Sequence, residues 1–115
     1  MEVQIFGIRK SADTRAALRF FAERRIKTHF VNFDERAPSP GELRRFAERF
    51  GVPALAERDG HRLAAMGLKA ALEKLSVEPL LLRMPLVRWQ QQLTIGPAAD
   101  VWQEWVASGT PRPGG

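Results

Sequence analysis

The spacing of hydrophobic residues along the chain changes from strand-like to helix-like and back. Apolar runs rich in β-branched and aromatic residues predict strands over 3–6 and 26–33. From residue 13 to about 25, apolar residues recur at helical spacing and arginines occupy the opposite side. A helix of this length between two strands favours a βαβ crossover and a parallel strand pair.

The next helix carries its own start and stop signals. Ser39 is placed to cap it, Pro40 fits the first helical position, and Glu42 lies where a capping box needs it. The helix is predicted to continue to Phe50, and Gly51 is placed for a left-handed C-terminal cap.

The middle of the chain predicts further helix. After a break at 52–53, residues 54–74 have a helical pattern in two pieces, interrupted near 59–60. A turn at 76–79 then leads into a leucine run at 80–82. We expect these residues to form a helical insertion between two parts of a sheet.

The last part of the chain predicts a β-hairpin followed by a helix. Strands at 86–89 and 92–95 flank a turn at 90–91, and the helix over 98–106 places two tryptophans on one face. Residues 108–115 offer nothing apolar to bury, so we expect a disordered tail. The element order is βαβα, a helical insert, then ββα.

Length and composition restrict the chemistry. The 115 residues suit one domain, predicted over 1–107 with the helical insertion at about 52–82. The chain has no cysteine, which excludes disulfides, thiolate metal sites and thiol nucleophiles. His29 and His61 are too few for a metal cluster without carboxylates, so no metal or other cofactor is predicted. No apolar run approaches the length of a membrane span, and the strand-like N-terminus predicts a cytoplasmic location.

The formal net charge of +5 raises the question of nucleic-acid binding. The basic residues are spread along the chain and alternate with acids, as in 42–49. Tyrosine is absent, and the three tryptophans lie towards the C-terminus rather than among the basic residues. This pattern favours a solvated surface, and nucleic acid ranks last among the partners considered.

Two short segments resemble a known family. The sequence at 6–11, Phe-Gly-Ile-Arg-Lys-Ser, is similar without a gap to the Y-G-I-K-N-C pattern that follows the first strand in arsenate-reductase-like proteins. These proteins belong to the thioredoxin superfamily, in a group that also holds the Spx transcription regulators. The sequence at 78–86, Glu-Pro-Leu-Leu-Leu-Arg-Met-Pro-Leu, is similar to the family's P-x-L-L-x-R-P segment. The resemblance spans the chain to about residue 107 and implies an α/β, thioredoxin-like fold with a mixed sheet of about four strands.

The differences from the family fall on its functional residues. Ser11 occupies the position of the catalytic cysteine, and Thr14 that of the second cysteine in members with a Cys-x-x-Cys pair. Met84 replaces the arginine before the proline, although Arg83 remains. The arginine pair that helps to bind oxyanions in some reductases has no counterpart in 94–97. Thiol-based arsenate reduction is therefore not expected, and no catalytic residue is assigned.

Two interpretations apply to the loop around Ser11. Its hydroxyl can cap the helix by accepting an N–H from residue 13 or 14, which is the favoured interpretation because no histidine is expected nearby to activate it as a nucleophile. Arg9, Lys10 and the helix N-terminus form a candidate anion site, which Arg83 would approach if the family geometry holds. The alternative is a solvated basic loop.

Two further residues carry expectations from the resemblance. Thioredoxin-like folds place a cis proline at the position of Pro85, so we predict a cis Met84–Pro85 bond with a structural role. A glycine in the loop after the second helix contacts RNA polymerase in Spx-like regulators, and Gly51 lies in a similar place. The competing interpretation is that this glycine only ends the helix, a structural role that needs no partner.

The sequence thus leaves two main functions open. The favoured hypothesis is a non-catalytic protein that acts as a protein-binding or regulatory module, with RNA polymerase as the partner implied by resemblance. The alternative is an oxidoreductase or transferase-like enzyme that binds an oxyanion or glutathione, with Ser11 in place of the cysteine.

Overall fold

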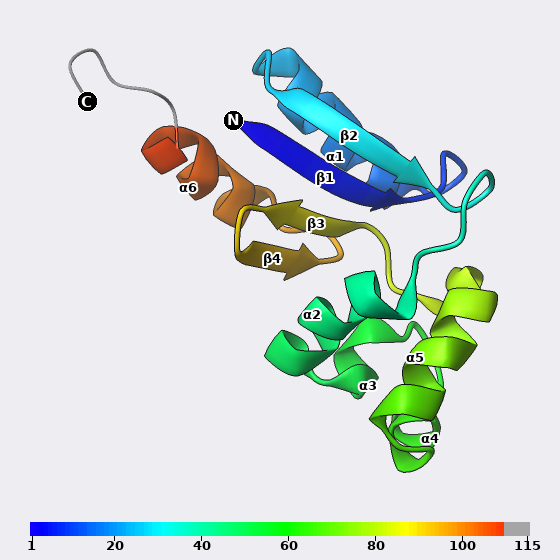
Figure 1. The fold of residues 1–115 in the computed structure, drawn as a ribbon. Coiled ribbons are helices and arrows are strands. Elements are labelled where there is room, and N and C mark those ends of the chain that lie inside the picture. Colours follow the sequence, from blue (N-terminus) through cyan, green and yellow to red (C-terminus); the bar gives the residue numbers. More distant parts are fainter. Residues whose placement is uncertain (110–115) are drawn as a thin grey trace.

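A computed structural model describes residues 1–109 of the chain (Figure 1). Its centre is a four-stranded sheet with the order β2-β1-β3-β4. The strands are β1 (Glu2–Gly7), β2 (Lys27–Asn32), β3 (Leu86–Trp89) and β4 (Gln92–Ile95). β1 pairs with β2 in parallel and with β3 antiparallel, so the sheet is mixed. The predicted parallel pair, the hairpin and the α/β fold class are confirmed.

Helices cover both faces of this sheet. α1 (Ala12–Glu23) and α6 (Ala99–Gly109) lie behind the sheet in Figure 1. α2 (Pro40–Phe50) and the short helices between α2 and β3 lie on the other side. Side chains along each strand point alternately to the two faces of the sheet, so the hydrophobic core forms two clusters, one on each face. One cluster joins Val3 and Ile5 to Phe21 and the buried tryptophans, and the other joins Phe6 to the helices of the middle segment.

Helix α2 begins and ends where the local sequence predicts. Ser39 Oγ accepts the Glu42 N–H at 3.1 Å, and the Glu42 carboxylate accepts the Ser39 N–H at 2.9 Å, which completes the capping box. Gly51 has the expected positive φ of 85°, but its ψ of 150° is not that of a left-handed cap. The expectation of a left-handed helical cap at Gly51 is therefore wrong, because the chain turns there directly into another helix.

The middle segment contains shorter helices than the sequence pattern indicated. Val52–Leu55 forms α3 where a break was expected, since proline is tolerated in the first turn of a helix. α4 (Gly60–Ala65) and α5 (Leu68–Val77) follow, with a second interruption at Gly67, whose φ is 91°. A short 3₁₀ helix, η1 (Pro79–Leu81), ends the segment.

The two ends of this middle segment meet. Ala56 and Leu82 form an isolated antiparallel bridge, and the Arg83 N–H donates to Leu55 O at 2.7 Å. These contacts join the two ends of the segment that runs from α3 to η1.

The C-terminal helix is longer than predicted. α6 runs from Ala99 to Gly109, so the first two residues of the expected tail are helical. Residues 110–115 of that tail lie outside the described residues. Trp102 and Trp105 are each 3% exposed and pack in the core against Phe21 and Trp89, as expected for a core face. No helix in residues 1–109 is long and apolar enough to cross a membrane.

Candidate functional site

The loop between β1 and α1 holds Ser11 in a capping geometry. The Ser11 N–H donates to Ile8 O at 3.1 Å, which closes a turn directly after the strand. Ser11 has an extended backbone, with φ −73° and ψ 119°, and its Oγ accepts the Thr14 N–H at 3.1 Å. The hydroxyl oxygen thereby satisfies one of the N–H groups that a helix start leaves without a backbone partner.

Ser11 has no base beside it. Within residues 1–109, the Thr14 N–H is the sole hydrogen-bond partner of Ser11 Oγ. His29 lies exposed on the edge strand β2, and His61 lies exposed in α4. Serine oxygen is a weak nucleophile at neutral pH unless a neighbouring base removes its proton. The loop geometry provides a cap and no activated nucleophile.

The cationic residues of the loop mostly have partners. The Arg9 guanidinium lies 5.0 Å from the centre of the Phe30 ring, over β2. Arg15 Nη1 donates to Arg9 O at 2.7 Å and to Lys10 O at 3.1 Å, so an arginine from the helix satisfies two carbonyls of the loop. This role of Arg15 was not expected from the sequence, because its spacing from the loop gives no signal of the contact. The Lys10 side chain is exposed.

Arg83 has a different set of contacts. Its Nε lies 3.7 Å from Glu57 Oε2, and its aliphatic stem packs against Gly96, where an added Cβ would lie 3.5 Å from Arg83 Cδ. No hydrogen bond or ion pair between described residues joins Arg83 to Arg9, Lys10 or Ser11. The structure therefore brings three of the four candidate anion-binding residues together in one loop and pairs the fourth with an acid of the middle segment.

Thr14 places a buried hydroxyl at the start of α1. The residue is fully buried, and its Oγ1 has no hydrogen-bond partner among the described residues. It packs against Gly7 so closely that an added Cβ on Gly7 would lie 2.9 Å from Thr14 Cγ2. The start of α1 thus fits tightly against the end of β1.

The Met84–Pro85 peptide bond is cis. Pro85 O accepts the Gly96 N–H at 2.8 Å, which links the start of β3 to the end of β4. Gly96 has a φ of 73°, a conformation that glycine adopts without strain. These contacts give Pro85 a structural setting at the base of the hairpin.

Superposition on solved structures of other proteins identifies the fold. An arsenate reductase from Vibrio cholerae superposes with a TM-score of 0.73 at 22% identity, over 90% of this chain and 97% of that one. An ArsC-family-related protein from Bacteroides fragilis superposes with a TM-score of 0.75 at 15% identity, over 90% and 98%. The chain has the arsenate-reductase-like form of the thioredoxin fold. An arsenate-reductase-related protein from Brucella melitensis gives a TM-score of 0.61 at 18% identity, over 91% and 94%.

Comparisons of sequence find no match. No protein-family model matches the chain, and no curated protein matches it. The arsenate-reductase-like fold is therefore established through structure. Within this fold the chain has no cysteine at any position. In the described residues, no group of three or more histidine, aspartate or glutamate side chains is placed to hold a metal ion.

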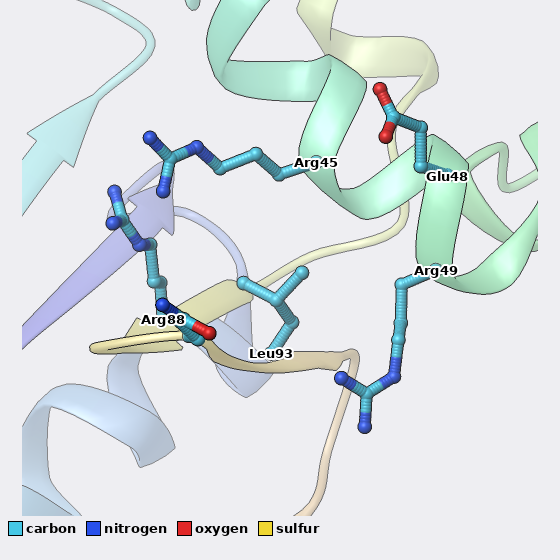
Figure 2. Close-up of a pocket in the computed structure, with 6 residues that line it drawn as sticks. Arg45, Glu48, Arg49, Arg88 and Leu93 are labelled. Carbon is cyan, nitrogen blue, oxygen red and sulfur yellow. The ribbon is translucent and has the colours of Figure 1, made fainter.

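Three arginines without an ion-pair partner among the described residues line a cleft away from the Ser11 loop. A cleft of about 460 Å³ opens between α2 and the β3–β4 hairpin. Its lining residues, here called the arginine cleft, are Arg45, Glu48, Arg49, Arg88, Gln91 and Leu93 (Figure 2). From the alternation of acids and bases, this part of α2 was expected to be a solvated surface. The signal available was the spacing of Arg45 and Arg49, which places both on one face of the helix.

Proposed function

We propose that this protein is a non-catalytic member of the arsenate-reductase-like group and acts as a protein-binding or regulatory module. The observation that carries the proposal is the state of Ser11, whose oxygen caps α1 and has no base beside it within residues 1–109. Without a thiol or an activated hydroxyl, a protein of this fold has lost the redox chemistry, but its surfaces can still bind other proteins.

The surroundings of Ser11 support the same conclusion. Two loop carbonyls are taken up by Arg15, and Arg9 is stacked on Phe30. Arg83 pairs with Glu57. An oxyanion at the Ser11 loop would find Lys10 and the first N–H groups of α1, because both arginines of the candidate site, Arg9 and Arg83, have partners within the protein. The alternative, an enzyme that binds glutathione or an oxyanion through Ser11, lacks a general base.

The enzymatic alternative is tested by kinetics on the intact protein and its Ser11→Ala variant. Arsenate reduction is measured with glutathione as reductant, and glutathione binding is measured by calorimetry. We expect both proteins to show the background rate and no saturable binding. A rate above background that disappears in Ser11→Ala would overturn the proposal, because a cap contributes to stability and to no chemical step.

The partner suggested by resemblance is RNA polymerase, through the surface around Gly51. A substitution at Gly51 itself is unsuitable, since its φ of 85° would strain any other residue. Phe50 is adjacent and 40% exposed, which makes Phe50→Ser the better probe. Val77 on α5 is 78% exposed and provides a matched control, Val77→Ser.

The binding experiment uses purified bacterial RNA polymerase immobilised on a sensor. We expect wild-type protein and Val77→Ser to bind equally, and Phe50→Ser to bind more weakly because a contact residue is lost. Absence of wild-type binding would remove RNA polymerase as the partner. Equal binding by all three proteins would place the contact elsewhere on the surface.

A further inference from the structure

The arginine cleft gathers like charges from elements that are distant in the sequence. Arg45 and Arg49 extend from α2, and Arg88 extends from β3 (Figure 2). The guanidinium groups of Arg45 and Arg88 are turned toward one another in this view, with Leu93 of β4 beside them. Sheet register explains the placement, because Arg88 is opposite Gln4 on one side and Leu93 on the other, on the face that α2 approaches.

None of these arginines has an acidic partner in the part of the chain that the structure describes. The ion pairs found there use Arg36 and Arg83, together with two lysines. Arg88 Nε donates to Gln90 O at 2.7 Å, which fixes the guanidinium and leaves its terminal nitrogens available. Glu48 lines the same cleft, but its carboxylate lies apart from the Arg45–Arg88 pair in Figure 2.

The charges in the cleft disfavour one another. Burial lowers the pKa of the Arg88 guanidinium from its ordinary value, and the positive charge of Arg45 lowers this pKa further. Arginine nevertheless stays protonated at neutral pH, so the repulsion persists. A bound anion would remove it.

A second hollow of about 280 Å³ shares Arg45 and Arg88 with the cleft. It adds the Gln4 side chain and the residues at the start of α2, where Glu42 already pairs with Arg36 at 3.0 Å. The space available beside the two arginines is therefore larger than one anion and extends along the sheet surface.

We propose that the arginine cleft binds a dianionic phosphate group, either free or carried by a small organic ester. The planar guanidinium fork matches phosphate oxygens in bidentate geometry, and the guanidinium groups of Arg45 and Arg88 face one another without an ion-pair partner among the described residues. The volume is in the range of small-molecule sites, and Leu93 offers an apolar contact for the organic part of an ester. This site is separate from the Ser11 loop and does not depend on the function proposed above.

The test is calorimetric titration of the intact protein with inorganic phosphate and with phenyl phosphate, at an ionic strength held constant with chloride. The variants are Arg45→Gln and Arg88→Gln, with Arg19→Gln on α1 as the matched exposed control. We expect saturable binding that each cleft variant weakens by about tenfold, as the loss of one charge-assisted contact predicts. Arg19→Gln should keep the wild-type affinity.

The ligand comparison distinguishes the source of the phosphate. Tighter binding of phenyl phosphate would identify an ester, whose ring contacts Leu93, and equal binding would identify the free ion. The absence of saturable binding at millimolar concentrations would overturn the proposal. So would equal weakening in all three variants, because that result reports net charge alone. Binding of a tetraglutamate peptide without phosphate binding would make the cleft a protein-contact surface and also overturn it.

A second measurement guards against a misfolded variant. Arg45→Gln removes the repulsion acting on Arg88, so the thermal midpoint of the ligand-free protein should rise while phosphate affinity falls. A structural role for Arg45 would lower the midpoint. The opposite directions of the two readouts separate a ligand site from a stabilising contact.

Discussion

Replacing Ser11 by alanine tests whether this residue is a helix cap. The substitution removes the acceptor of the Thr14 N–H, a bond of 3.1 Å at the start of α1. Loss of a serine cap costs about 1 kcal/mol, within a range of roughly 0.5 to 2 kcal/mol. We expect the upper half of that range, because Thr14 is fully buried and water cannot easily replace the lost acceptor. For a domain of this size the midpoint of thermal unfolding should fall by about 4 °C per kcal/mol.

Two further substitutions at the same position sharpen the test. Ser11→Asp keeps an oxygen acceptor and adds a negative charge at the positive end of the helix, so its stability should equal or exceed that of the wild type. Ser11→Gly should cost only a few tenths of a kcal/mol relative to serine. The order Asp, Ser, Gly, Ala from most to least stable is specific to a cap.

The assay is urea unfolding followed by tryptophan fluorescence, since Trp102 and Trp105 are buried in the core. The free energy of unfolding is obtained by linear extrapolation for each variant. Unchanged stability in Ser11→Ala would refute the capping argument. An aspartate variant as unstable as the alanine variant would also refute it, because both the acceptor and the charge would then be irrelevant.

The remaining predictions concern stability elsewhere in the fold. Thr14→Val removes a buried hydroxyl without a partner in the described residues and should raise the urea midpoint by the equivalent of about 1 kcal/mol; a lower midpoint would mean that the hydroxyl is satisfied. Trp102→Phe removes the 2.8 Å bond from Trp102 Nε1 to Thr94 Oγ1 and should cost about 1–3 kcal/mol, part of it restored by Thr94→Val in the same protein. Burial opposes ionisation of Glu42, but hydrogen bonds from Arg36 and from the start of α2 outweigh it and lower its pKa below 4.5. This contribution to stability is present above pH 4.5 and disappears as the pH falls through the lowered value, so urea midpoints against pH should show a shallower acid loss in Glu42→Gln.

Elements with local signals were predictable from the sequence. The bounds of α2 follow from a capping box between residues that are neighbours in the chain, and the hairpin follows from two alternating runs around a short turn. α3 was not predictable in the same way, because Val52-Pro53 fits both a break and a first helical turn. The ψ of Gly51 decides between them, and a glycine tolerates either conformation.

Predictions about the site depended on distant contacts and were correspondingly incomplete. Ser11 as a cap is a local property, and the sequence indicated it. The partner of Arg83 is Glu57, which depends on how the middle segment closes on itself. The arginine cleft depends on the register of β3 against β1 and on where α2 crosses the sheet, neither of which a single sequence reveals.

The Ser11 loop and the arginine cleft differ in how far their charged and polar groups are paired within the protein. This difference favours the cleft over the loop as the surface that binds a ligand. In the Ser11 loop, the capping oxygen, two carbonyls and the Arg9 side chain all have partners within the protein. In the arginine cleft, the guanidinium groups of Arg45 and Arg88 face one another, and neither has an ion-pair partner among residues 1–109. Folding alone favours the first arrangement and disfavours the second. A charge arrangement that costs stability persists more readily where a ligand uses it, which makes the surface of α2 and the hairpin a better place to search for function than the loop that holds Ser11.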